Sequence, residues 1–409
     1  MTTAILVIFA ATYLGVALGH IPGLAIDRTG IALLGAVAMV AAGALTTEMA
    51  IAAIDFPTIL LLYGLMVVSS QFRLSGFYTV VAVRLTELLA RPRTFLAATL
   101  AVSALLAALL TNDIVCLAFT PVLTAALLRA HLNPVPFLLG LACATNIGSA
   151  ATIIGNPQNM LIGQVGRLAF APFLAWCLPP VVLSLAVLYG LLLLIYRGRL
   201  LLPAAVVPAA EPLADWPAYH AHQTRKGLGG LAVLLVLLFT PLPRELVALT
   251  VAAVFLCSRS IKTRAILGFV DWHLITLFCG LFMVVRALET TGLPAWTVQR
   301  LAAHGLALTD GTLLTLVAAG LSNIVSNVPA TMILVRFLDP LTAEPWYVLA
   351  LASTFAGNLI TIGSIANLIV IEQAQRYGVR IGFREHARVG IPVTVATLAV
   401  LLVWLQVAG

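Results

Sequence analysis

The chain has 409 residues, of which 62% are hydrophobic and only 9% are charged, and its formal net charge is +7. Roughly a quarter of the residues in a soluble domain are charged, so this composition excludes a soluble globular protein and predicts an integral membrane protein. A positive charge is also typical of nucleic-acid-binding proteins. Basic residues that flank membrane spans explain it better here, and we expect no nucleic-acid partner. The five cysteines form no CxxC pair, so we expect neither a disulfide framework nor a metal site.

Long uncharged runs predict an all-α fold with about ten membrane crossings and two re-entrant hairpins. The first half, residues 1–196, is expected to hold spans near 4–20, 30–48 and 57–71, an amphipathic segment at 73–93, a hairpin at 94–129, a broken span at 136–165 and a last span near 171–196. The N-terminus lacks a basic region, so it is predicted to be the first span and not a cleavable signal peptide.

A polar linker at 197–227 separates this half from the second, residues 228–409. The second half is expected to hold spans near 228–242, 246–258 and 272–286, an amphipathic segment at 293–304, a hairpin at 311–336, a broken span at 345–371 and a last span at 389–407. The same order of elements is thus predicted twice.

Short motifs also recur about 216 residues apart. Asp55-Phe56 is repeated as Asp271-Trp272, and Gly64-Leu65 as Gly280-Leu281. Further matches are Gly76 with Gly292, Arg84-Leu85 with Arg300-Leu301, and Thr111-Asn112 with Ser326-Asn327. An internal repeat in so apolar a chain predicts a secondary transporter, with its site where the two halves meet.

The basic residues predict how the chain is oriented. Five crossings per half is an odd number, so the second half must be inverted relative to the first. With the N-terminus outside, 17 of the 22 Lys and Arg lie on one face, and only Arg167, Arg244, Arg286, Arg300 and Arg336 lie on the other. The positive-inside rule then places both termini outside and the linker in the cytoplasm. We expect the inner (plasma) membrane of a bacterium.

Polar residues inside the apolar runs are the candidate site, because non-helical backbone at membrane depth is tolerated only where protein buries it or it lines a cavity. Glycine and proline allow the helix to unwind, and freed carbonyls and helix N-termini can bind ions. The substrate- or ion-binding candidates are Thr111, Asn112, Asp113, Thr145, Asn146, Ser149, Thr152, Asn156, Asn159, Ser326, Asn327, Thr331, Asn358, Thr361, Ser364 and Asn367. Gly148, Gly155, Gly357 and Gly363 are predicted to supply backbone freedom.

These motifs resemble the ion transporter superfamily, which includes arsenite permeases, P-protein-like permeases, citrate transporters and divalent anion:sodium symporters. The resemblance rests on Asn112-Asp113 at one hairpin tip, on the run from Asn146 to Asn159 that contains Gly155-Asn156-Pro157-Gln158-Asn159, and on Gly363-Ser364-Ile365-Ala366-Asn367. It implies that the hairpins and broken spans form a transport unit that moves against the remaining spans. It also implies a homodimer as one possible assembly. The Ser-Asn-Thr signature of sodium-coupled dicarboxylate carriers is not intact in either tip.

Asp113 is the acidic residue placed deep between two apolar arms, which makes it a functional candidate. It could carry a coupling proton, help to coordinate a cation, or cap the helix that follows. The asparagines could likewise cap or bridge helices, and the hydroxyls could bond back to helix carbonyls. Cys116 and Cys143 could bind a metalloid or be small core residues.

We therefore expect a secondary-active transporter, and not an enzyme, that moves a small anion or oxyacid by alternating access and resembles arsenite permeases. It should need no cofactor beyond a coupling ion, with a proton favoured over sodium. Three alternatives stay open: a carrier for citrate or dicarboxylates, an anion channel, and a membrane-embedded enzyme. Such an enzyme would need acid–base or metal ligands at depth, and apart from Asp113 the four interrupted segments hold none. Counterflow exchange separates carriers from channels.

Overall fold

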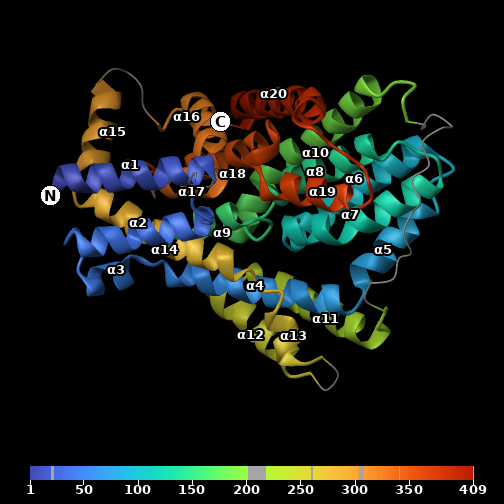
Figure 1. Cartoon of the computed structure of the whole chain (residues 1–409), viewed down its shortest axis with the longest axis horizontal. Coiled ribbons are helices and arrows are strands. Elements are labelled where there is room, and N and C mark those ends of the chain that lie inside the picture. The colour runs from blue at the N-terminus through green and yellow to red at the C-terminus, as the bar shows by residue number, and fades with distance from the viewer. Residues whose placement is uncertain (20–22, 201–217, 259–260, 304–307, 340, 409) are drawn as a thin grey trace.

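The computed structural model describes residues 1–19, 23–200, 218–258, 261–303, 308–339 and 341–408, and these ranges are helical without strands. The first half contains α1 (Thr2–Leu18), α2 (Arg28–Ala41), α3 (Thr47–Ala53), α4 (Phe56–Leu74), α5 (Phe77–Thr86), α6 (Pro92–Leu109), α7 (Asn112–Arg129), α8 (Pro134–Ser149), α9 (Pro157–Val165) and α10 (Phe170–Ile195). Figure 1 shows the whole chain.

The second half repeats this order, with one added 3₁₀ turn. It contains α11 (Ala221–Leu238), α12 (Arg244–Leu256), α13 (Thr263–Leu267), α14 (Trp272–Glu289), α15 (Leu293–Ala303), α16 (Gly311–Val325), α17 (Asn327–Leu334), α18 (Glu344–Ala356), η1 (Thr361–Gly363), α19 (Ile365–Gln375) and α20 (Phe383–Ala408). The all-α prediction is confirmed. The boundaries of the two halves at 196 and 228 stay a prediction.

Among the described residues, six helices are long and apolar enough to cross a membrane: α4, α6, α7, α10, α14 and α20. Two of these, α6 and α7, are the arms of the first predicted hairpin. Two predicted spans, α1 and α2, are shorter apolar helices, as are α8 of the first broken span and α16 of the second hairpin. The span predicted at 30–48 ends at Ala41, and a separate helix, α3, follows.

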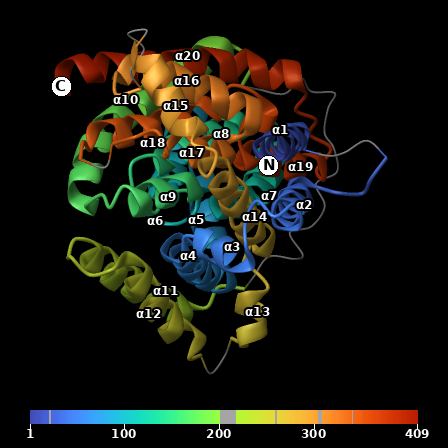
Figure 2. The ribbon, with the colours of Figure 1, turned by 90° about the vertical axis from the view of Figure 1, so that its left-hand side faces the viewer.

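Helices of one half pack against helices of the other half, an arrangement that we call crosswise packing. α2 lies along α14, and α12 lies along α4. Both crossings are close because glycine is at the contact: a Cβ added to Gly64 would lie 2.9 Å from the carbonyl carbon of Ala248, and one added to Gly280 would lie 2.9 Å from that of Ala32. In Figures 1 and 2, α4 and α11–α13 lie at one side of the molecule and α20 at the opposite side.

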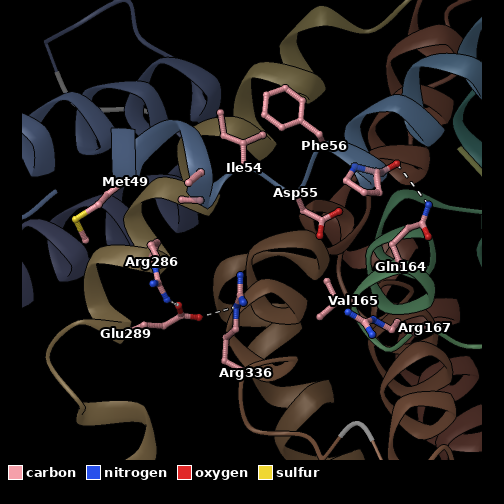
Figure 3. Close-up of a pocket in the computed structure, with 13 residues that line it drawn as sticks. Met49, Ile54, Asp55, Phe56, Gln164, Val165, Arg167, Arg286, Glu289 and Arg336 are labelled. Carbon is pink, nitrogen blue, oxygen red and sulfur yellow. Dashed lines mark hydrogen bonds and ion pairs between the residues drawn. The ribbon is translucent and has the colours of Figure 1, made fainter. Parts of the chain in front are cut away.

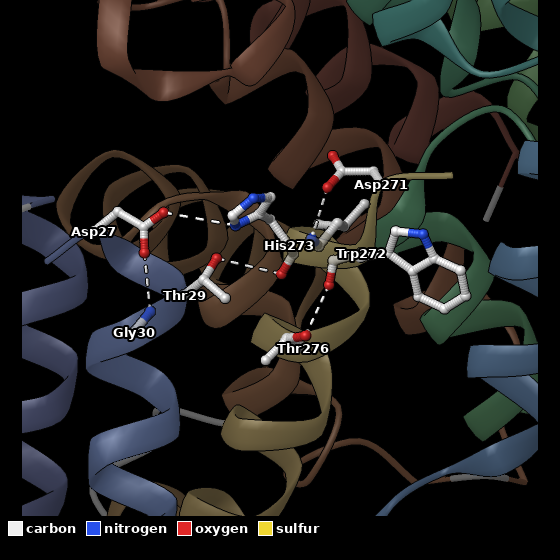
Figure 4. A network of polar contacts seen from close by, with 8 residues as sticks. Asp27, Thr29, Gly30, Asp271, Trp272, His273 and Thr276 are labelled. Carbon is white, nitrogen blue, oxygen red and sulfur yellow. Dashed lines mark hydrogen bonds and ion pairs between the residues drawn. The ribbon is translucent and has the colours of Figure 1, made fainter. Parts of the chain in front are cut away.

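Polar contacts tie the N-termini of α2 and α14 together (Figure 4). Asp27 caps α2 by accepting from the Gly30 amide at 2.9 Å, and Asp271 caps α14 by accepting from the Leu274 amide at 2.9 Å. Thr29 Oγ1 donates to the carbonyl of His273 at 3.2 Å. These contacts fix the register of the α2–α14 crossing.

Hairpins and broken helices occur in both halves. α6 and α7 meet at Leu110 and Thr111, whereas α16 and α17 meet at Ser326 alone. The α8–α9 helix is broken over 150–156, and the α18–α19 helix over 357–364. Each hairpin packs on its own broken helix, α6 on α8 and α16 on α18, and each second arm also contacts the other half, α7 on α19 and α17 on α9.

The segment predicted as linker, 197–227, is helical at its end. α11 begins at Ala221, and Gln71 Nε2 donates to Gln223 Oε1 at 2.9 Å in its first turn. Residues 201–217 of that linker lie outside the described residues. His386 is buried within α20 against Gly390.

Candidate functional site

Asn146 lies at the centre of a buried amide network that joins the two halves. Its Nδ2 donates to Asn358 Oδ1 at 2.9 Å and to Asn367 Oδ1 at 3.3 Å. Its Oδ1 accepts from Asn112 Nδ2 at 3.2 Å and from Ser364 Oγ at 2.9 Å. One side chain of α8 thus contacts the first hairpin tip and both sides of the second helix break.

Helix ends position these side chains. Asn112 is the first residue of α7, and its amide N–H donates to the Gly155 carbonyl in the first break at 3.3 Å. Ser364 caps α19, accepting from the Ala366 amide at 3.3 Å. Asn367 Nδ2 donates to the Gly357 carbonyl at 2.8 Å, which satisfies backbone freed by the break. The interruptions in the helices therefore place amides where two breaks and one hairpin tip meet.

Two buried amide atoms in this network have no hydrogen-bond partner among the described residues: Asn112 Oδ1, an acceptor, and Asn358 Nδ2, a donor. The hydroxyls of Thr111 and Thr331, at the two hairpins, are also buried without a hydrogen-bond partner among these residues. Buried polar groups are nearly always hydrogen-bonded, so these atoms mark a place where a polar ligand would be stabilised.

Asn156 and Asn159 brace the first break. Asn156 Oδ1 accepts from the Asn159 amide at 2.8 Å, and its Nδ2 donates to Ser149 Oγ at 2.9 Å. Asn159 Nδ2 donates to the Thr152 carbonyl at 2.9 Å, and Thr152 Oγ1 donates to the carbonyl of Ala108. Apart from a contact of Asn156 with Thr354, these predicted site residues bond to backbone and to one another, so their contacts support a structural role.

The second hairpin tip has an unusual backbone. Ser326 has φ 77° and ψ 157°, a conformation that essentially only glycine adopts and that costs about 1–3 kcal/mol. With its amide oriented to donate, Asn327 bonds the carbonyls of Gly363 and Ser353 at 3.2 Å each. The strained tip is therefore held against the second break by Asn327.

The remaining candidates are distributed around this centre. Asp113 is the second residue of α7 and is half-buried; Thr111 is the N-cap, so Asp113 lies in the first turn, where the helix dipole favours a carboxylate. Thr145 Oγ1 donates to the Ala142 carbonyl at 2.9 Å and contacts Cys116 Sγ at 3.1 Å. Thr361 lies in η1 and is half-buried. Cys143 is buried in the core.

The four glycines serve close packing. None of Gly148, Gly155, Gly357 and Gly363 has a positive φ, so their left-handed freedom is not used. Instead, a Cβ on Gly155 would lie 2.2 Å from the Ser149 carbonyl oxygen, and one on Gly148 would lie 2.4 Å from Ala104 Cα. Close approach is therefore one reason for glycine at these positions, and their role in backbone freedom stays a prediction.

Thr354 bonds residues of the first break, but it is not among the site residues predicted from the sequence. Its Oγ1 accepts from Asn156 Nδ2 and from Gln158 Nε2, each at 3.3 Å, and so joins α18 to the first break. A threonine four residues before Asn358 in a buried helix was the available signal. No lysine or arginine occurs in the four interrupted motifs, so amides, hydroxyls and helix ends supply the polarity of the site.

Comparison with known proteins agrees with this architecture. The family described as citrate transporter matches residues 4–356. Among curated relatives, the inner membrane protein YbiR of Escherichia coli is 33% identical over 82% of this chain and 84% of its own. The silicon efflux transporter LSI3 of rice is 28% identical over 93% of this chain and 92% of its own.

Among solved structures, the YdaH transporter of Alcanivorax borkumensis is similar, with a TM-score of 0.57 and 14% identity over 99% of this chain and 97% of that one. At this identity the likeness concerns the fold. The family match covers most of the chain, and the rice relative is named as a transporter. The chain therefore belongs to the citrate transporter family of the ion transporter superfamily, and it is an integral membrane protein.

Proposed function

We propose that this transporter is a secondary-active carrier that binds a small oxyacid or anion at the Asn146 network and moves it by alternating access. The observation that carries the proposal is the pair of unpartnered amide atoms, Asn112 Oδ1 and Asn358 Nδ2, which lie on either side of Asn146. The network draws on both halves of the chain, as expected for a site at the junction of two repeats.

The chemistry of these two atoms favours a substrate that carries hydroxyl groups. Asn112 Oδ1 can only accept a hydrogen bond, and Asn358 Nδ2 can only donate one. A protonated oxyacid has O–H donors and oxygen acceptors on one small centre, so it can satisfy both. A fully ionised anion would leave the Asn112 oxygen without a donor. An arsenite-like oxyacid therefore fits the site better than a bare anion.

Asp113 supports proton coupling over sodium coupling. It is the charged side chain in the first turn of α7, next to Asn112, and it is half-buried. A carboxylate at membrane depth is costly when ionised, so a proton that binds and leaves during the cycle offers a coupling mechanism. The name of the rice relative supports an oxyacid as the substrate, because dissolved silicon is also an uncharged hydroxyacid at neutral pH.

A carboxylate carrier is the second candidate, and one observation favours it. α7, α9, α17 and α19 all begin at a hairpin tip or a helix break. The N-termini of α7 and α19 meet at Asn146, because Asn112 and Ser364 both bond its side chain. Helix N-termini stabilise anions, including carboxylates. The family description, citrate transporter, agrees with this alternative.

Counterflow in proteoliposomes tests both candidates. The purified protein would be reconstituted with unlabelled arsenite, silicic acid, citrate or succinate inside, and uptake of labelled substrate would be followed with separate proton and sodium gradients. We expect saturable exchange of an oxyacid that responds to the proton gradient. Exchange of citrate or succinate alone would favour the second candidate. Flux that neither saturates nor exchanges would identify a channel and contradict the proposal.

A further inference from the structure

A cavity of about 580 Å³ lies apart from the amide network (Figure 3). Its wall is formed by α3 and the start of α4, by the ends of α9 and α14, and by Arg336, which follows α17. α9 and α17 are a broken-helix segment and a hairpin arm, whereas α4 and α14 are the crosswise-packed helices. The cavity therefore opens at the seam between the two groups of helices.

Three arginines and two carboxylates line this cavity: Arg167, Arg286, Arg336, Asp55 and Glu289. Arg286 Nη1 lies 2.8 Å from Glu289 Oε2, and Arg336 Nε lies 2.9 Å from Glu289 Oε1. A single carboxylate thus serves two guanidinium groups, and it joins α14 to the end of the second hairpin. Asp55 is engaged as the cap of α4, accepting from the Thr58 amide at 2.8 Å.

Arg167 adds a third positive charge at the edge of the cavity. It follows α9 in a left-handed conformation, with φ 49°, and its side chain lies beside Val165 (Figure 3). Next to it, Arg244 Nη2 donates to the Leu168 carbonyl at 2.6 Å and holds this turn against α12. The lining therefore carries more positive than negative charge, and its guanidinium groups retain donors beyond those bonded to Glu289.

The sequence makes this concentration of arginine informative. Five of the 22 basic residues were assigned to the less basic face, and three of those five line this one cavity. A concave site with an excess of positive charge raises the local concentration of anions. Guanidinium groups bind carboxylates and phosphate-type oxyanions bidentately, and the volume is within the range of small-ligand sites.

We infer that this cavity is a second anion-binding site, a vestibule in which a small carboxylate or phosphate-type oxyanion displaces Glu289 from Arg336 and Arg286. Displacement would also break the ion pair that joins α14 to the second hairpin, so occupancy would loosen the seam. A role of this cavity in capturing the transported substrate rests on the proposed transport function, but anion binding in the cavity does not.

Calorimetric titration of the purified full-length protein with citrate, and separately with inorganic phosphate, tests this inference. The titrations are done in the Asn146→Ala background as well, so that binding at the amide network is removed and the vestibule remains. We expect Arg336→Gln to weaken anion binding by about tenfold, the loss of one charge-assisted pair. Glu289→Gln should instead tighten binding, because it removes the competing carboxylate.

The opposite signs of these two effects distinguish a binding site from a structural ion pair. Arg376→Gln is the matched control. Arg376 does not line the cavity, and its Nη2 lies 3.1 Å from Glu372 Oε1 in an exposed ion pair. Arg167→Gln is the substitute for any variant that fails to fold, and it should also weaken binding. Weaker binding in Glu289→Gln, or unchanged binding in both arginine variants, would overturn the vestibule. Absence of counterflow with arginine-dependent binding intact would overturn the transport function alone.

Discussion

At the scale of single residues, Asn146 forms side-chain hydrogen bonds with three residues of the other half: Asn358, Ser364 and Asn367. Asn146→Ala removes all four of its hydrogen bonds and leaves the amides of Asn112, Asn358 and Asn367 short of partners. Each buried group left unsatisfied costs about 1–3 kcal/mol, so we expect both lower thermal stability and counterflow reduced by roughly 10- to 100-fold.

Ser70→Ala is the matched control for this substitution. Ser70 is also buried, but its hydroxyl bonds only the Met66 carbonyl of its own helix, at 2.7 Å. It should transport as the wild type does. If Asn146→Ala transports normally once its folding is verified, the network is structural and the substrate binds elsewhere.

Asp113 is the residue whose substitution would distinguish proton coupling from a purely electrostatic role at the N-terminus of α7. Asp113→Asn keeps a polar side chain in the first turn of α7 but can no longer exchange a proton. We expect facilitated counterflow to persist while uptake driven by an inward proton gradient is lost. The measurement is flux with and without a pH gradient. Retained acceleration by the gradient would exclude Asp113 as the proton carrier.

At the scale of elements, the first helix break depends on a glycine. Gly155→Ala would bring a Cβ to 2.2 Å from the Ser149 carbonyl oxygen, within the break itself. Backbone must move to relieve this overlap, so we expect a loss of about 1–3 kcal/mol in stability and impaired transport. Thermal unfolding and counterflow measure the two effects.

Gly320→Ala is the control at this scale, because nothing lies within 4 Å of the added Cβ on α16. Helix propensity favours alanine over glycine by about 1 kcal/mol, so this variant should be as stable as the wild type or slightly more so. An equal loss in both variants would show that the break does not need close approach at Gly155.

At the scale of the whole molecule, orientation in the membrane follows from the basic residues. Cys257, at the end of α12, is the exposed cysteine among the five, and the predicted topology places it on the cytoplasmic side. A membrane-impermeant maleimide should therefore label it in inverted vesicles and not in right-side-out ones. Cys257→Ser should abolish the labelling. Labelling only from outside would reverse the predicted topology.

The sequence alone determined the local features of this protein. Apolar run length gave the helices, and interruptions such as Ser326 and the 150–156 segment were predicted because glycine, proline and asparagine disfavour helix locally. The motif resemblance also indicated the superfamily, which the family match confirms. The recurrence of Gly64 as Gly280 was also visible in the sequence, but the close helix packing at both glycines was not.

Only the tertiary structure decided which of these residues meet. The crosswise packing of α2 on α14 and α12 on α4, the convergence of four side chains on Asn146, and the gathering of Arg167, Arg286 and Arg336 around one cavity all join residues far apart in the chain. Such contacts depend on how whole helices pack, since apolar helix surfaces fit many partners and local sequence does not select among them. The same physics explains why Asn159 bonds the Thr152 carbonyl within its own break, whereas Asn146, also an asparagine of a broken span, bonds residues of the other half.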